Sequence, residues 1–114
     1  MRGLALLLAL AALPAYGQSV ADRLNDYPTA ARADYVFACM ASNGQTRQTL
    51  EKCSCSIDQI ATILPYAKYV EAETVMSMRR TGGERMAIFR SAASASALVA
   101  DLKRAQAEAE VICF

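Results

Sequence analysis

Histidine is absent from all 114 residues of the chain, and this absence narrows the possible chemistry. Without histidine the usual Ser-His-Asp and Cys-His catalytic arrangements cannot be assembled. The commonest protein partner for zinc and for Cu(II) is missing as well. The sequence also contains no phosphate loop, nucleotide-binding glycine fingerprint or calcium loop. The sequence therefore predicts that the protein is not an enzyme with a histidine-dependent catalytic site or a nucleotide-binding motif. We also expect no cofactor.

Excess charge of either sign is also lacking. Lys and Arg number 12 and Asp and Glu number 11, which gives a formal net charge of +1. If Arg2 is lost with the leader described next, the two totals become equal. A chain without net charge has no general attraction for nucleic acid or for anionic membrane surfaces. We therefore expect neither of them as a partner.

The start of the chain has the layout of a secretory signal peptide. Arg2 gives a positive start, residues 3–13 form an apolar stretch, and the small residues Ala15 and Gly17 stand just before a cleavage point. The apolar stretch is shorter than the ~20 residues that a membrane-spanning helix needs. No cysteine lies near the cleavage point to carry a lipid. We expect residues 1–17 to be cleaved, with an uncleaved membrane anchor as the alternative.

The remaining residues 18–114 are expected to form a single domain, because about 100 residues suffice for one small core and not for two. This part of the chain contains all four cysteines. Four cysteines in an exported protein of this size predict two disulfide bonds. Such bonds persist in oxidising compartments, so the expected location is the bacterial periplasm or the outside of the cell.

Few helix breakers interrupt this domain, and each one marks a boundary. A breaker-free stretch follows Pro28 and stops at Gly44, Pro65 ends a second, and Gly82 and Gly83 end a third. Apolar side chains repeat at spacings of three and four, which is typical of helices that bury one face, and no stretch alternates as a strand would. The predicted fold class is therefore all-α, a small bundle of four to five helices stapled by two disulfides. The helices are expected over residues 29–43, 46–64, 66–80, 84–92, and from 94 or 96 to 112.

Several local details accompany this prediction. Thr46 is expected to cap the second helix, and Thr81 with Glu84 to form a capping box for the fourth. The small residues 91–96 are expected to form a linker, and residues 18–27 a loosely packed segment. The buried face of the third helix is expected to hold Tyr66, Tyr69, Val70, Glu73 and Met76, and that of the last helix Leu98, Leu102, Ala105, Ala109 and Ile112.

The triplet Cys53-Ser54-Cys55 lies between two distant single cysteines, Cys39 and Cys113. On a helix, residues two apart point about 200° away from each other, so Cys53 and Cys55 cannot pair. Two full pairings remain: 39–53 with 55–113, or 39–55 with 53–113. Loop entropy does not separate them. A helical hairpin turning near Gly44 brings Cys53 closer to the level of Cys39, so we favour Cys39 with Cys53 and Cys55 with Cys113.

A thiol–disulfide oxidoreductase that uses Cys53 and Cys55 is the alternative enzymatic interpretation. If the helix began later, with Ser56 and Gln59 as its capping box, the triplet would lie in a turn at a helix N-terminus. Lys52 would then supply the cationic neighbour that lowers a thiol pKa. The absence of predicted strands argues against this hypothesis, because such enzymes use an α/β scaffold.

Cu(I) handling is a third and weaker interpretation. Cys53 and Cys55 together with Met76 and Met78 are soft ligands of the kind that Cu(I) prefers. Filling of the core is the simpler role for the two methionines.

Four arginines form a locally basic stretch around Gly82 and Gly83 that could bind an anionic group or an acidic partner. The simpler interpretation is a solvated helix end, where cations are favoured by the helix dipole. The residues are Arg79, Arg80, Arg85 and Arg90.

Three segments, residues 35–40, 52–58 and 113–114, resemble those of small uncharacterised exported bacterial proteins with four cysteines and a helical fold. The resemblance implies export and disulfides and no particular chemistry. Together with the missing catalytic motifs, it leads us to expect a non-catalytic binding or accessory protein. Its partner would be an unidentified periplasmic or secreted protein, with no contact with the membrane after signal cleavage.

Overall fold

A computed structural model describes residues 26–114, and the predicted signal peptide lies outside this range. The described chain is all-helical, with four helices of 15 to 21 residues and two short helical segments between the third and the fourth. No strand occurs between residues 26 and 114. The elements are α2 (Thr29–Asn43), α3 (Arg47–Ile63), α4 (Tyr66–Thr81), the 3-10 helix η1 (Glu84–Met86), α5 (Ala87–Ser91) and α6 (Ala93–Cys113).

The helix boundaries follow the breakers in the sequence. Pro28 immediately precedes α2, and Gly44 ends it with a φ of 107°, a conformation that glycine adopts without steric cost. Thr46 caps α3 as predicted, because its Oγ1 accepts a hydrogen bond from the backbone N–H of Thr49 at 3.1 Å. Pro65 separates α3 from α4. Since α3 runs unbroken through the cysteine triplet, the later helix start is wrong.

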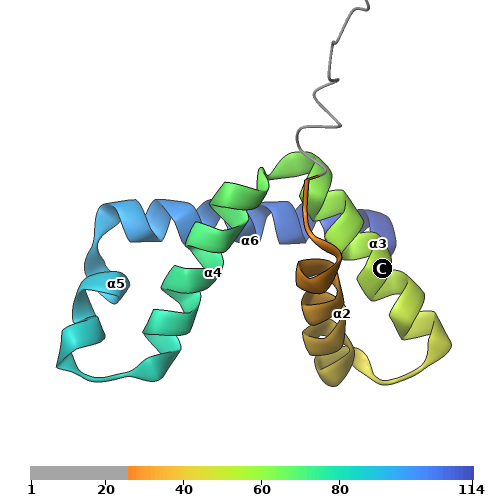
Figure 1. Cartoon of the computed structure of the whole chain (residues 1–114), viewed down its shortest axis with the longest axis horizontal. Helices are drawn as coiled ribbons and strands as arrows, with labels where there is room; N and C mark the ends of the chain where they lie inside the picture. The colour runs from red at the N-terminus through yellow and green to blue at the C-terminus, as the bar shows by residue number, and fades with distance from the viewer. Residues whose placement is uncertain (1–25) are drawn as a thin grey trace, which may run out of the picture.

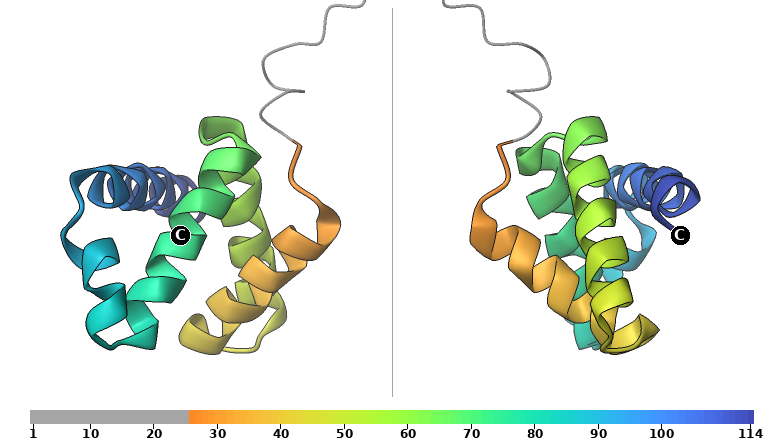
Figure 2. Two further views of the ribbon diagram at one scale, coloured as in Figure 1. Left: turned by 60° about the vertical axis from the view of Figure 1, so that its left-hand side comes forward. Right: turned by 90° about the vertical axis from the view of Figure 1, so that its right-hand side faces the viewer.

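Helix α6 connects the two halves of the fold. Figure 1 shows α2 and α3 as one hairpin, α4 and α5 as a second group, and α6 running behind both. Helix α6 packs against α3 and against α4, whereas α2 packs mainly on α3. The two further views in Figure 2 show the same arrangement, with α2 on the face of α3 that is turned away from α6. Helix α3 is therefore covered on two sides.

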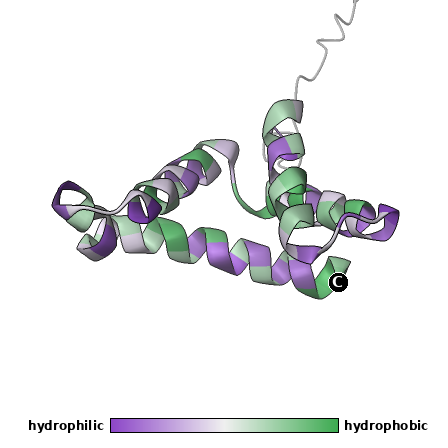
Figure 3. Ribbon diagram, turned by 90° about the horizontal axis from the view of Figure 1, so that it is seen from below, coloured by the Kyte–Doolittle hydropathy of each residue, from purple (hydrophilic) through white to green (hydrophobic). Residues whose placement is uncertain are grey.

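The core combines large and small apolar side chains of α3 and α6, with Leu102 as a large buried residue of α6. Ile57 and Ile60 of α3 are almost completely buried, as are Ala105 and Ala109 of α6. Alanine at these positions lets the two helix backbones approach closely. Figure 3 shows hydrophobic and hydrophilic residues alternating along α6. The further buried apolar residues are Tyr27, Cys53, Ala61, Leu64, Tyr69, Ala72, Val75, Ala95, Val99 and Leu102.

Four sequence predictions fail in detail. Val70 is 42 % exposed and Ile112 62 % exposed, so neither lies on a buried face. The small residues 91–96 are not a linker, because α6 begins at Ala93 and buries Ala95. The predicted capping box is also absent. Thr81 is still part of α4, and its hydroxyl donates to the backbone carbonyl of Ser77.

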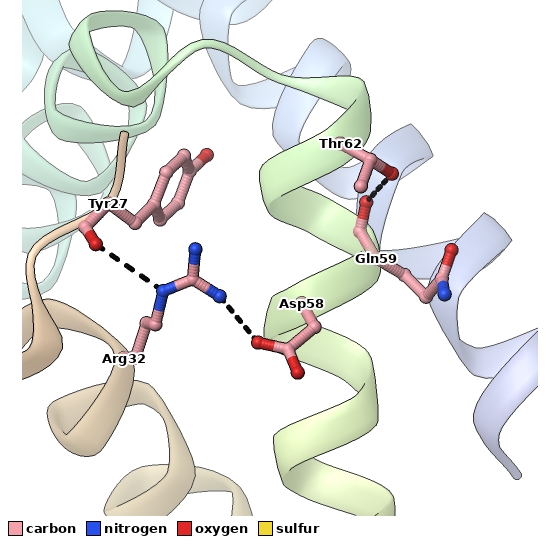
Figure 4. Close-up of polar contacts among 5 residues, drawn as sticks. All are labelled: Tyr27, Arg32, Asp58, Gln59 and Thr62. Atoms are coloured by element: carbon pink, nitrogen blue, oxygen red, sulfur yellow. Dashed lines mark hydrogen bonds and ion pairs between the residues drawn. The ribbon is translucent and has the colours of Figure 1, made fainter. Parts of the chain in front are cut away.

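Tyr27 is part of the core rather than of a loosely packed segment. Its side chain is 5 % exposed, and its ring lies 5.1 Å from that of Tyr66 and 5.0 Å from that of Tyr69. Arg32 fixes the chain at this point, since its Nε donates to the Tyr27 carbonyl at 3.3 Å and its guanidinium pairs with Asp58 of α3 (Figure 4). The rest of the predicted loose segment, residues 18–25, lies outside the described range.

Candidate functional site

Two disulfides connect the cysteine triplet of α3 to two other helices. Cys39 of α2 is bonded to Cys53, with a Cα–Cα distance of 5.9 Å, and Cys55 is bonded to Cys113 of α6, at 5.7 Å. This is the pairing that helix geometry favours. The first bond closes the α2–α3 hairpin and the second fastens α6 to α3. Helix α6 packs along α3, and Ser56, the neighbour of Cys55, is buried.

These bonds leave no free thiol among residues 26–114. Cys53 is fully buried and its partner is not Cys55, so a reactive Cys53–Cys55 pair would require both disulfides to open. Met76 is half-buried and packs against the core. No group of three or more His, Cys, Asp or Glu side chains in this range could hold a metal ion.

The four arginines of the basic stretch have different surroundings. Arg79 donates to the Ser96 hydroxyl at 3.3 Å, and Arg90 donates to the Gly83 carbonyl at 3.0 Å, which closes the turn before η1. Arg80 lines the polar cleft described next, and Arg85 is exposed. Binding of an anion by this stretch stays a prediction.

A polar cleft of about 580 Å³ opens between α2 and α4, with side chains of α3 and α6 also in its lining. All four long helices contribute to it, so its shape depends on how both halves of the fold are held by α6. The lining residues are Tyr35, Ala38, Cys39, Ser42, Asn43, Ser56, Glu73, Arg80, Gln106, Glu110 and Phe114.

Glu73 is the half-buried carboxylate of this cleft. Burial raises its pKa above the ordinary value, and the negative charge of Asp34 acts in the same direction, whereas Arg80 acts against them. The fold therefore disfavours the charged form of Glu73. The sequence pattern placed Glu73 on the inner face of α4 but gave no reason for a carboxylate there.

Tyr35 and Ser56 lie near Glu73 in the same cleft. Burial raises the pKa of the Tyr35 hydroxyl, and Glu110 and Glu73 raise it further, while the nearby Ser56 hydroxyl acts in the opposite direction. Ser56 itself is 1 % exposed, and its Oγ has no partner of ordinary hydrogen-bond geometry within the described chain. A buried hydroxyl without a full partner is uncommon in native proteins. The sequence signal for it is a serine that stands three residues after Cys53 and one before Ile57, both buried residues of α3.

A second surface, the apolar groove, lies on the other side of the hairpin between α2 and α3. It has a volume of about 510 Å³ and an almost entirely apolar lining, with the Arg32–Asp58 ion pair at one end. Phe37 is its most prominent residue, because the ring is 76 % exposed. Phe37 was not among the residues that the sequence pattern indicated. The apolar lining residues are Ala33, Val36, Phe37, Met40, Leu50 and Ile57.

Comparison with protein-family models, with curated proteins and with solved structures finds no match for this chain. Within residues 26–114, no helix has the length and apolar character needed to cross a membrane.

Proposed function

We propose that this protein is an exported binding protein without catalytic activity, which acts by contacting another protein in the bacterial periplasm or outside the cell. Export is supported by the two disulfides, which are typical of proteins in oxidising compartments. The N-terminal residues 1–17, with the pattern of a signal peptide, support the same location.

The observation that carries the binding role is the exposure of Phe37 in the apolar groove. A large aromatic side chain that is 76 % exposed beside Val36, Met40 and Leu50 favours contact with a partner over contact with water. A groove between two helices suits the apolar face of an amphipathic helix, which is a recurring mode of protein recognition. The Cys39–Cys53 bond holds α2 and α3 in place, so little conformational entropy is lost when the partner binds.

Site-specific photocrosslinking tests the proposal. A photoreactive phenylalanine analogue replaces Phe37 in the exported protein, and a second protein carries the analogue at Val111, which is 86 % exposed and does not line the groove. A discrete adduct is expected from position 37 alone. The purified partner is then titrated with the original protein, with Phe37→Glu and with Val111→Glu.

We expect Phe37→Glu to weaken binding at least about tenfold, which corresponds to about 1.4 kcal/mol, and Val111→Glu to bind normally. Equal binding by the original protein and Phe37→Glu would show that the groove is not the contact surface. The oxidoreductase alternative is tested on the same protein with a dithiol substrate. Turnover that disappears in Cys53→Ala, where the chain remains folded, would establish the enzyme instead.

A further inference from the structure

The charged residues of the described chain fall into two groups of opposite sign. Residues 79–104, from the last turn of α4 through η1 and α5 to the middle of α6, contain six Lys and Arg but only two Asp and Glu. The other described residues, 26–78 and 105–114, contain four Lys and Arg and eight Asp and Glu. We call the first group the basic end, with a net charge of +4, and the second the acidic end, with −4.

The fold keeps these two groups apart in space. Figure 1 shows η1 and α5 at one end of the molecule and the α2–α3 hairpin at the other, with α6 running between them. The left view of Figure 2 shows the same separation. Helix α6 alone is about 30 Å long, whereas charges in physiological salt are screened within about 8 Å. An anion at the basic end therefore experiences the local charge of +4 and not the net charge of the chain.

An exposed apolar side chain accompanies the cations at the tip of the basic end. Ile88 of α5 is 63 % exposed. Arg85 stands three residues before it and is exposed, and Arg80 belongs to the last turn of α4. Arg90 closes the turn before η1 through its hydrogen bond to the Gly83 carbonyl. An exposed apolar residue close to several cations is typical of surfaces that bind membranes containing anionic lipids.

The position of this tip favours a lipid surface over a second protein. The segments η1 and α5 form the outer edge of the basic end, where the chain turns from α4 to α6 (Figure 1). A protruding edge enters the headgroup region of a bilayer without a matching hollow. A protein partner would need a complementary pocket to bury Ile88.

We propose that the basic end docks on an anionic lipid surface, with Ile88 in the headgroup region and Arg80 and Arg85 beside lipid phosphates. Each cation near such a surface strengthens the attraction, and guanidinium groups donate charge-assisted hydrogen bonds to phosphate oxygens. The expectation of no membrane contact came from the net charge of the whole chain, which does not reveal this separation. The same surface repels the acidic end, so the α2–α3 hairpin points away from it and the apolar groove stays accessible to a protein.

Fluorescence of a single introduced tryptophan tests this docking, because the chain has no tryptophan of its own. The intact, oxidised protein carries either Ile88→Trp or, as the control, Val111→Trp at an exposed position of the acidic end. Vesicles of equal parts phosphatidylglycerol and phosphatidylcholine are compared with vesicles of phosphatidylcholine alone. We expect a blue shift of the emission and weaker quenching by acrylamide only for Ile88→Trp and only with the anionic vesicles.

Two double variants of equal net charge separate docking by the tip from general charge attraction. Arg80→Gln with Arg85→Gln is expected to weaken partitioning onto anionic vesicles roughly twentyfold, at about fivefold for each charge. Arg47→Gln with Lys68→Gln removes two exposed cations of the acidic end and should bind as the original protein does. Vesicle sedimentation measures both, and the variants carry the same N-terminal residues.

Three results would overturn the proposal. The first is equal binding, or no binding, to anionic and uncharged vesicles. The second is the same effect from both double variants, since overall charge would then govern binding. The third is binding of poly-L-glutamate through Arg80 and Arg85 without binding of anionic vesicles, which would make the tip a contact surface for an acidic protein. None of these results bears on the groove, whose test uses crosslinking at Phe37.

Discussion

The Tyr27 hydroxyl donates a hydrogen bond to the backbone carbonyl oxygen of Leu64 at 2.7 Å, across 37 residues of sequence. This carbonyl stands where α3 has ended and α4 has not begun, so it lacks the partner that a helix interior would provide. Tyr27 thereby fastens the segment before α2 to the junction of α3 and α4, and its ring fills the space beside Tyr66 and Tyr69.

Tyr27→Phe tests how much this hydrogen bond contributes to stability. The variant keeps the ring but leaves the buried Leu64 carbonyl unpaired, so we expect a loss of about 1–3 kcal/mol of unfolding free energy. In a domain of this size each kcal/mol lowers the Tm by about 4–8 °C. Thermal unfolding followed by circular dichroism measures the change. A Tm equal to that of the original protein would show that water satisfies the carbonyl.

The second disulfide should contribute more to stability than the first. Cys55 and Cys113 are 58 positions apart in the sequence and Cys39 and Cys53 only 14, so the loop entropy of the unfolded chain gives about 4 kcal/mol against about 3 kcal/mol. Double alanine variants of each pair, compared by chemical denaturation, give the two values. The order would be reversed if strain or residual structure in the unfolded state dominated over loop entropy.

The disulfide pairing itself can be checked by mass spectrometry without reduction. Trypsin leaves Cys53 and Cys55 on one peptide, residues 53–68, so the cross-linked peptide must be fragmented at Ser54. We expect Cys53 to carry the peptide of Cys39 and Cys55 to carry the peptide of Cys113. A bond between Cys53 and Cys55 would contradict the structure and favour the redox interpretation.

Glu73 should make stability depend on pH. Because its pKa is raised in the folded protein, folding favours the protonated form, and this contribution is complete below the ordinary value of 4.5 and lost as pH rises through the folded pKa. Glu73→Gln cannot ionise, so the variant does not lose this stability as pH rises. We expect the variant to have a higher Tm than the original protein at neutral pH, with a difference that shrinks below pH 4.5.

Glu71→Gln is the control for this prediction. Glu71 lies on the same helix but is exposed and pairs with Lys68 at 3.5 Å. Its substitution should change the Tm little at any pH, since exposed ion pairs contribute at most about 1 kcal/mol. If both variants show the same pH dependence, the effect belongs to overall charge and not to the burial of Glu73.

The alanines of α6 should not tolerate larger side chains. Ala109 is fully buried against the core, so Ala109→Leu must displace neighbouring atoms and should cost about 1–3 kcal/mol. Ala107→Leu, at an exposed position of the same helix, should be nearly neutral. Denaturant titration of the two variants gives the unfolding free energies to be compared. Equal stability would mean that α6 can move away from α3 without loss.

Breakers and periodicity were enough to predict α2, α3 and α4, because their boundaries are set by local residues such as Pro28, Gly44 and Pro65. Periodicity predicted α6 but not its start, because no breaker or capping side chain marks Ala93. The disulfide pairing was also accessible, since the levels of Cys39 and Cys53 in a hairpin follow from the helix rise alone. These features depend on short stretches of chain and on fixed helix geometry.

The features that were missed depend on contacts between distant segments. The small residues 91–96 resemble a linker in composition, but small side chains are also what a close helix contact requires, and Ala95 is buried in one. Tyr27 is an isolated aromatic with no periodic neighbours. Ser56 is a buried polar residue on a helix that packs against both α2 and α6. Periodicity along one helix cannot reveal which other helix covers it.

The position of Cys113 sets the order in which the two disulfides can form. If the chain enters an oxidising compartment N-terminus first, Cys39, Cys53 and Cys55 arrive before Cys113, so the hairpin bond can close while Cys55 is still a thiol. Before α3 becomes helical, the Cys55 thiolate can attack one sulfur of the neighbouring Cys39–Cys53 bond and release the other as a thiolate. Correct pairing is therefore secured late, when α6 docks on α3 and removes Cys55 from exchange.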